Sequence, residues 1–324
     1  MTHDVDDLLA QIPAPEELPA GHKSGFVAVV GRPNVGKSTL LNAILGEKIA
    51  IVSPKPQTTR LRQLGILTEP DKQIVFVDTP GIHDPRTALG RFMVEIAVDA
   101  LRDADVILFV VDVSSPPTAE DRRIAELIEQ AGAGATTLLT LNKADLAAGP
   151  EALQARADEH RALVPAADWV TTIATTGAGL PDLMTRLVEK LPPGPRYYPQ
   201  DQLSDVAVRD IVAEIVREKA LLNLDEEVPH GIATQVEEFK LRSDDLTYIH
   251  AVIYVERESH KGILIGKGGR MLKTISQQAR EEIESFLGTR VYLELWVKVL
   301  KNWRRDENAL RRLGYRLPRP KQGR

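Results

Sequence analysis

The chain has 324 residues, no cysteine and a formal net charge of −5. Its length suits two or three domains, and the lack of cysteine excludes disulfides and thiolate metal sites. No apolar run approaches the ~18 residues of a membrane-spanning helix, and the start of the chain lacks the basic and apolar segments of a secretory signal. We therefore expect a cytoplasmic protein.

The two ends of the chain differ in charge. Residues 1–23 are acidic and broken by proline, and we expect them to form a disordered tail. From Lys240 onward the chain carries 19 Lys and Arg residues against 10 Asp and Glu residues. Such a basic segment on an acidic chain suggests a polyanionic partner, with a merely solvated basic surface as the alternative.

Between residues 24 and 192, apolar runs alternate with amphipathic, helix-like segments, and the runs lie at 26–30, 73–77, 106–111, 136–141 and 169–174. Near-continuous Val, Ile and Leu is typical of strands buried on both faces of a parallel sheet, and the alternation predicts a doubly wound α/β domain. Only four residues join 61–68 to the run that follows, too few for a parallel crossover. We expect an antiparallel hairpin there, and hence a mixed sheet.

The first run leads directly into GRPNVGKS at 31–38, which matches G-x-x-x-x-G-K-[ST] between a strand and a helix. The N–H groups of such a loop surround phosphate oxygens, and the dipole of the next helix adds to the attraction. Lys37 would reach the β- and γ-phosphates, and Ser38 would offer a hydroxyl to Mg²⁺. The predicted phosphate site comprises Asn34, Val35, Gly36, Lys37, Ser38 and Thr39.

Two later segments carry groups suited to the third phosphate. In KPQTTR at 55–60, Thr59, or alternatively Thr58, would complete the Mg²⁺ shell; a plain loop is the other interpretation. In FVDTPG at 76–81, Asp78 would hold Mg²⁺ and the Gly81 N–H would sense the γ-phosphate. Both segments would be ordered by the γ-phosphate and released after hydrolysis.

The sequence LNKAD at 141–145 predicts the base. Asp145 would accept hydrogen bonds from the ring N–H and the amine of guanine, and adenine presents neither donor there, so GTP is favoured over ATP. Asn142 would support the loop, and the stem of Lys143 would cover one face of the ring. A solvated turn at a strand end is the alternative.

A proline-rich linker at 193–205 ends the first domain. Beyond it, the order helix–strand–strand–helix–helix–strand predicts a separate α+β domain at 206–306, followed by a basic tail at 307–324. We expect Trp296, on the last strand, to lie in the core. For Trp303 the sequence allows either a core position or a base-stacking surface position.

Between two helices of this second domain lies a G-x-x-G loop, at 266–269. Such loops let a nucleic-acid backbone approach and clamp about four nucleotides of a single strand. Nearby lysines and an arginine would add phosphate contacts that weaken with salt. The predicted RNA site comprises Lys261, Ile265, Gly266, Lys267, Gly268, Gly269, Arg270 and Lys273, with a purely structural helix–turn–helix as the alternative.

The four motifs of the first domain resemble those of translation-factor-related GTPases of the Era and MnmE type, and the second domain resembles a type II KH domain. One P-loop GTPase domain followed by one KH domain is similar to the Era family over roughly residues 24–310. The resemblance implies a Ras-like, mostly parallel sheet, GTP and GDP with Mg²⁺ as cofactors, and hydrolysis of GTP to GDP and phosphate. It also implies binding near the 3′ end of 16S rRNA, a role in 30S subunit assembly controlled by the nucleotide, and, in some relatives, contact with the cell membrane. No obligate protein partner is evident.

The resemblance also bears on single positions. Ile82 stands where Ras-like proteins carry a water-orienting glutamine, so water must be positioned otherwise. Asn34 matches an asparagine with which relatives hold K⁺, an ion that would place positive charge on the transition state; Asn34, Lys37, Thr59 and Gly81 form the expected catalytic set. Ala174 and Thr175 occupy the places of a Ser-Ala pair whose backbone contacts guanine.

Other readings fit less well. A tandem ribosome-assembly GTPase would show two P-loops, and a tRNA-modifying GTPase would carry a carboxyl-terminal cysteine; this chain has one P-loop and no cysteine. A P-loop kinase of small molecules would lack NKAD. An RNA-binding protein with a vestigial nucleotide site would not retain Lys37, Ser38, Asp78 and Asp145.

Overall fold

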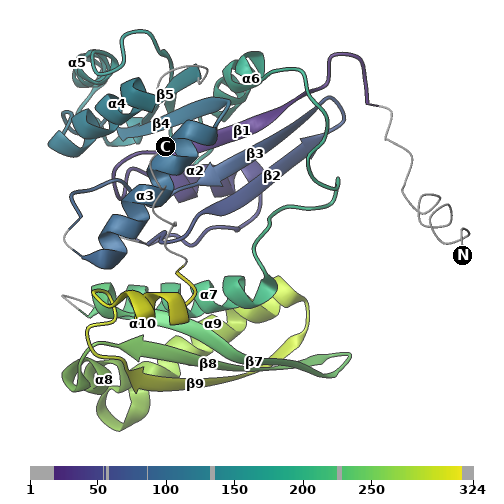
Figure 1. Ribbon diagram of the computed structural model, residues 1–324, viewed down its shortest axis with the longest axis vertical. Coiled ribbons are helices and arrows are strands. Elements are labelled where there is room, and N and C mark those ends of the chain that lie inside the picture. Colours follow the sequence, from purple (N-terminus) through teal and green to yellow (C-terminus); the bar gives the residue numbers. More distant parts are fainter. Residues whose placement is uncertain are drawn as a thin grey trace, which may run out of the picture.

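The structure is a computed structural model that describes residues 18–53, 55, 58–85, 87–131, 136–224 and 228–315. Most of the predicted tail at 1–23, residues 56 and 57 of the threonine loop, and the end of the predicted basic tail lie outside these ranges. Figure 1 shows two units, each with its own sheet, joined by the segment that follows helix α6. None of the described helices is long and apolar enough to cross a membrane.

The first unit is built on a six-stranded sheet in the order β2-β3-β1-β4-β5-β6. All neighbouring strands run parallel except β2 and β3, which form the predicted antiparallel hairpin. Every residue of β4 is buried, as expected for a strand covered on both faces. The strands are β1 Lys23–Val30, β2 Gln63–Glu69, β3 Lys72–Asp78, β4 Val106–Asp112, β5 Thr136–Asn142 and β6 Asp168–Thr172.

Helices cover both faces of this sheet, so the predicted doubly wound α/β architecture is confirmed. They are α2 Lys37–Leu45, α3 Ala88–Asp103, α4 Ala119–Ala131, α5 Pro150–Arg161 and α6 Leu180–Lys190, with a 3-10 turn, η1, at Ala144–Leu146. Side chains of α3, α4 and α5 pack on one face, and those of α2 and α6 on the other. The apolar pattern does not predict α5, because it buries only Ala157 and His160.

The second unit has the predicted order of elements and a three-stranded sheet, β7-β8-β9, in which β7 is antiparallel and β9 parallel to β8. Helices α7 and α9 cover one face of this sheet. The elements are α7 Val208–Asn223, η2 Pro229–Gly231, β7 Ala233–Ser243, β8 Leu246–Val255, α8 Glu258–Ile265, η3 Lys267–Gly269, α9 Arg270–Leu287, β9 Arg290–Val299 and α10 Glu307–Arg312.

The two tryptophans of this unit lie differently from one another. Trp296 is 53 % exposed, so the prediction that it belongs to the core is wrong. On β9 the odd-numbered Leu293, Leu295 and Val297 face the helices, and Trp296 therefore points away from them. Trp303, just beyond the sheet, is fully buried.

Trp303 belongs to a cluster that joins the two units. Leu89 and Phe92 of α3 pack there with Tyr254 of β8 and with Leu310 of α10. Phe92 also meets the ring of Tyr315 edge-on, 5.8 Å between centroids. The segment after β9 therefore packs between the first unit and the second sheet (Figure 1).

Candidate functional site

The predicted nucleotide residues converge where the carboxyl ends of the central strands meet the start of α2. Because parallel strands end at one edge, loops distant in sequence share that edge. They enclose a cavity of about 410 Å³. Eight predicted residues line it, namely Asn34, Gly36, Lys37, Ser38, Thr39, Thr59, Gly81 and Lys143.

Two glycines let the neighbouring loops approach the phosphate loop. Gly36 has a φ of 102°, and a Cβ atom there would lie 2.3 Å from Nδ2 of Asn142. A Cβ atom on Gly81 would lie 2.7 Å from the backbone nitrogen of Pro33. At both positions only glycine fits without displacing backbone or a buried amide.

Lys37 is buried at the base of this cavity, 6 % exposed. Its Nζ donates to the carbonyl oxygens of Gly31 and Arg32, both at 3.1 Å. Burial lowers the pKa of Lys37 to about 8, against the opposing attraction of Asp78. A buried cation whose charge Asp78 offsets only in part has strong affinity for an anion.

Three oxygens converge beside Lys37 in a way that suits Mg²⁺. Ser38 Oγ donates to Asp78 Oδ2 at 2.9 Å and lies 3.0 Å from Thr59 Oγ1. Burial raises the pKa of Asp78, and its Oδ1 is buried with no hydrogen-bond partner among the described residues. This set of one carboxylate and two hydroxyls fits Mg²⁺, which is usually held by one or two carboxylates together with substrate phosphates.

Of the residues predicted to contact guanine, some are buried and others are exposed. Asn142 is 1 % exposed, donates to Val35 O at 2.9 Å and accepts from the Ala174 N–H at 3.1 Å. It therefore connects the phosphate loop to the loop after β6. Asp145 and Thr175 are exposed and do not line the cavity.

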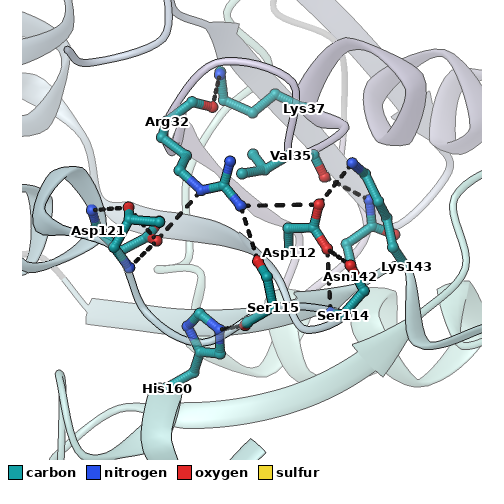
Figure 2. Close-up of polar contacts among 11 residues, drawn as sticks. Arg32, Val35, Lys37, Asp112, Ser114, Ser115, Asp121, Asn142, Lys143 and His160 are labelled. Atoms are coloured by element: carbon teal, nitrogen blue, oxygen red, sulfur yellow. Dashed lines mark hydrogen bonds and ion pairs between the residues drawn. The ribbon is translucent and has the colours of Figure 1, made fainter. Parts of the chain in front are cut away.

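Figure 2 shows a polar network behind the phosphate loop that the sequence did not reveal. Arg32 lies between two carboxylates, with Nε 3.3 Å from Asp121 Oδ2 and Nη2 3.8 Å from Asp112 Oδ2. Lys143 Nζ donates to the same Asp112 Oδ2 at 2.8 Å. Burial acts to raise the pKa of Asp112, but hydrogen bonds from Lys143 and Ser114 outweigh it, and the pKa lies below its usual value. Asp112 thus connects the base loop with the phosphate loop.

The only sequence signal for Asp112 was its place at the carboxyl end of a buried apolar run. In the sheet it pairs in register with Asn142, the first residue of the NKAD motif. Which helix and loop residues surround that position depends on the crossovers, so the contacts with Arg32 and Lys143 are visible only in the folded chain.

A second cavity, of about 530 Å³, runs between α9 and the edge strand β9. Its lining residues are Gly269, Leu272, Lys273, Ser276, Gln277, Arg280, Val291, Tyr292, Leu293 and Leu295. Of the predicted RNA residues, Gly269 and Lys273 line this groove. The others, Lys261, Ile265, Gly266, Lys267, Gly268 and Arg270, lie in or beside the G-x-x-G loop and not in its lining.

Arg280 and Tyr292 line this groove but were not among the residues predicted from the sequence. Lys273, Ser276 and Arg280 recur at helical spacing and so share one face of α9, a signal that was present. Tyr292 only borders the groove: it alternates with Leu293 on β9, and its ring stacks on that of Tyr248 on the uncovered face, 5.9 Å between centroids.

The G-x-x-G loop has the open surface that a nucleic-acid backbone needs. Gly266, Gly268 and Gly269 have φ values of 72°, 63° and 77°, in the left-handed region. A Cβ atom on Gly268 or Gly269 would meet no other atom within 4 Å. The loop therefore stands clear of the rest of the unit at the end of the groove.

Two protein families match the chain, one for each unit. Residues 26–143 match the family of 50S ribosome-binding GTPases, and residues 227–304 match the KH domain family.

Whole-length relatives show the same combination. The chain is 46 % identical over 295 residues to GTPase Era of Ruminiclostridium cellulolyticum, covering 91 % of this chain and 98 % of that protein. It is 49 % identical over 298 residues to GTPase Era of Caldanaerobacter subterraneus subsp. tengcongensis, with 91 % and 98 % covered.

Solved structures agree with the sequence relatives. A crystal structure of Era in complex with MgGDPNP and nucleotides 1506–1542 of 16S ribosomal RNA has a TM-score of 0.87 and 42 % identity, covering 91 % of this chain and 99 % of that chain. A variant of Aquifex aeolicus Era bound to GDP·AlF4⁻ has the same score and identity, covering 91 % and 100 %. With a phosphate loop, a guanine motif and a KH unit in one chain, and with these relatives matched over nearly their full length, the protein belongs to the Era family of GTPases.

Proposed function

We propose that this GTPase acts in ribosome biogenesis, in assembly of the 30S subunit, by binding RNA near the 3′ end of 16S rRNA. The observation that carries the proposal is the likeness to the Era structure that holds MgGDPNP and nucleotides 1506–1542 of 16S rRNA. The basic groove beside the G-x-x-G loop offers a place for a single strand.

In the nucleotide site, Lys37 and the backbone N–H groups from Asn34 to Thr39 hold the phosphates. Ser38, Thr59 and Asp78 hold Mg²⁺. Bound there, Mg²⁺ supplies positive charge that offsets the negative charge of the β- and γ-phosphates. Val35 acts through its backbone, because its side chain is fully buried.

The base is selected by Asp145, with the stem of Lys143 along the ring. The N–H of Ala174 is already donated to Asn142, so we assign the backbone contact with guanine O6 to Thr175. Asn142 is a support for both loops.

We assign Gly81, Thr59 and Asn34, which all line the cavity, to the surroundings of the γ-phosphate. The Ile82 side chain is 2 % exposed and packs in the core, so it does not take the place of a water-orienting glutamine. We retain K⁺ at Asn34 as a proposal, because a cation there would add positive charge where the transition state needs it.

The RNA site uses the loop and the groove as one surface. Lys261, Ile265, Gly266, Lys267, Gly268, Gly269 and Arg270 surround the loop and approach the nucleic-acid backbone. Lys273 continues this surface along α9, and Arg280 extends it. These basic side chains would contact phosphates.

In this scheme the γ-phosphate of GTP orders the segments at 55–60 and 76–81. Their order shifts the position of the KH unit, and hydrolysis releases the assembled complex. We assign 24–192 to the GTPase unit, 193–205 to the linker and 206–306 to the KH unit, with tails at 1–23 and 307–324. We place the protein in the cytoplasm, with peripheral contact at the inner face of the membrane through the basic carboxyl-terminal surface as a secondary site.

The nucleotide assignment is tested by turnover of GTP and ATP in Mg²⁺ by the wild type and by Asp145→Asn. We expect turnover of GTP only, and a shift of the variant toward xanthosine triphosphate, whose ring carbonyl suits the amide. Replacing K⁺ by Na⁺ in the same assay tests Asn34. Equal turnover of ATP and GTP by the wild type would refute the base assignment.

The RNA assignment is tested by crosslinking the purified protein to total RNA, with and without a non-hydrolysable GTP analogue. Enrichment of the 3′ end of 16S rRNA is the expected outcome. Crosslinks spread over RNA without that enrichment would contradict it.

A further inference from the structure

The loop that carries Thr59 is held at two points by one helix of the KH unit. Arg217 of α7 donates from Nη2 to the carbonyl oxygen of Thr58. The next residue, Glu218, accepts from the backbone N–H of Val52 at 2.9 Å. Adjacent side chains of a single helix therefore contact both limbs of the loop between α2 and β2.

Both side chains are almost completely removed from water, with Arg217 1 % and Glu218 2 % exposed. Each has a charged partner: Glu214 for Arg217, and Lys48 for Glu218 at 2.6 Å. Buried charges are costly unless they are paired and hydrogen-bonded. Because the contacts that satisfy them include the loop backbone, moving the loop away would leave part of this requirement unmet.

A third contact runs in the opposite direction. Arg60, next to Thr59, donates to the carbonyl oxygen of Ile232 at 2.5 Å and to that of His230 at 3.3 Å. Its guanidinium also lies over the ring of Trp303, 5.6 Å from the centroid. The residue before Thr59 and the residue after it are thus both attached to the second unit.

Thr59 itself faces the nucleotide site, with Oγ1 3.0 Å from Ser38 Oγ and 3.4 Å from Asp78 Oδ2. Its neighbours on both sides are fixed from outside the GTPase unit. We propose that Arg217 and Glu218 of the KH unit are positioning residues for GTP hydrolysis, which hold Thr59 at the magnesium site through the backbone of Thr58 and Val52. The proposal rests on the function assigned above to Thr59.

The KH core does not require these two side chains to point toward the loop. On the same helix, Val212, Val216 and Ala220 pack against the KH sheet. By linkage, a nucleotide that favours the ordered loop also favours the docked KH unit, by the same free energy. Displacement of the KH unit would free Thr59 and slow hydrolysis.

The test compares Arg217→Met and Glu218→Ala with Arg209→Met in the full chain. Arg209 is a matched control, because it also lies on α7 and donates to backbone carbonyls, those of Val236 and Glu237, but within its own unit. We expect kcat for GTP to fall at least tenfold in the first two variants. The affinity for GDP should change less than twofold, because GDP lacks the phosphate that Thr59 serves. Arg209→Met should match the wild type in both.

Deuterium uptake over residues 47–60, with a GTP analogue bound, provides a second measurement that needs no turnover. Faster exchange at Val52 in Glu218→Ala, but not in Arg209→Met, is the expected result. Two chemically different variants are used, so that loss of folding in one leaves the other to decide. Wild-type turnover and wild-type exchange in a folded variant would overturn the proposal. A wild type that hydrolyses no GTP would instead refute the proposed function. The exchange data would still show whether Arg217 and Glu218 hold the loop.

Discussion

Lys37 is buried, and the attraction of Asp78 offsets only part of the cost of burying its charge, so its charge depends on the ligand. A lysine ordinarily has a pKa near 10.5, and burial lowers that of Lys37 to about 8. Bound phosphate stabilises the charged form, so the pKa is higher in the complex than in the free protein. Binding above pH 8 must therefore take up a proton, and affinity falls as pH rises through the pKa of the free protein.

We expect the affinity for GDP to fall about tenfold between pH 7 and pH 9, as measured by calorimetry in the presence of Mg²⁺. Guanosine is the control, since it shares the titration of the base but has no phosphate to contact Lys37. A GDP affinity that stays constant over this range, or that changes only in parallel with guanosine, would contradict the role of Lys37.

Asp112 contacts both Arg32 of the phosphate loop and Lys143 of the base loop. In Asp112→Asn, Lys143 loses its carboxylate partner, and Arg32 keeps its contacts with Asp121 and Ser115. Hydrogen bonds between charged groups contribute about 1.5–3 kcal/mol. We therefore expect the affinities for GDP and for GTP each to fall about tenfold.

Asp168→Asn is the matched control for this change, because Asp168 pairs with Arg186 at the opposite end of the sheet. Its GDP affinity should stay within about twofold of the wild type. Equal affinities for GDP in Asp112→Asn and Asp168→Asn, measured by titration of a fluorescent GDP analogue, would show that Asp112 does not position Lys143.

Among the elements, α9 and β9 form the groove to which we assign RNA only together. The helix supplies Lys273 and Arg280, and the edge strand supplies Leu293 and Leu295. Removing one cation that contacts phosphate should weaken binding to all single-stranded sequences alike. It should also reduce the slope of log affinity against log salt by about 0.7.

Arg280→Ala should show both effects in salt titrations with a fluorescent RNA. Lys240→Ala is the control: it removes an exposed lysine from β7, at the opposite edge of the same sheet. A salt slope in Arg280→Ala equal to that of Lys240→Ala would place the RNA outside the groove.

The whole molecule depends on a buried contact between its units, in which Trp303 is central. Its Nε1 donates to Gly231 O at 2.9 Å, and its ring stacks on Tyr315 with 6.0 Å between centroids. Truncating such a side chain leaves a cavity. Trp303→Ala should therefore lower the free energy of unfolding by about 3 kcal/mol or more.

Trp296→Ala removes the same side chain from an exposed position on β9 and should change that free energy by about 0.5 kcal/mol or less. Urea unfolding of both variants, followed by circular dichroism, makes the comparison. Similar unfolding midpoints for the two variants would mean that the inter-unit cluster does not stabilise the molecule.

Much of this architecture could be predicted from the sequence, because its signals are local. The apolar runs marked the strands of the first sheet, and four connecting residues predicted the β2–β3 hairpin. The phosphate loop, Gly81 and Lys143 line one cavity because each follows a strand that ends at the same edge. The Trp296 expectation failed because a strand of the second sheet has an uncovered face, which composition does not reveal.

Contacts between distant backbone atoms lay beyond sequence reasoning. Arg217 and Glu218 bind the C=O of Thr58 and the N–H of Val52, backbone groups that every residue type except proline offers alike. Likewise, Asp112 meets Arg32 and Lys143 only because three crossovers bring their loops together. The first two contacts follow from how the units dock, and the contacts of Asp112 follow from the connections between strands of the first sheet.

If the third phosphate of GTP controls the KH unit, RNA affinity must depend on which nucleotide is bound. The most direct test is the affinity of the full chain for an RNA of nucleotides 1506–1542 of 16S rRNA, the segment held in the related Era structure, measured with saturating GDPNP and again with saturating GDP. We predict binding at least tenfold tighter with GDPNP. Equal affinity in the two states, with both nucleotides shown to be bound, would contradict the account.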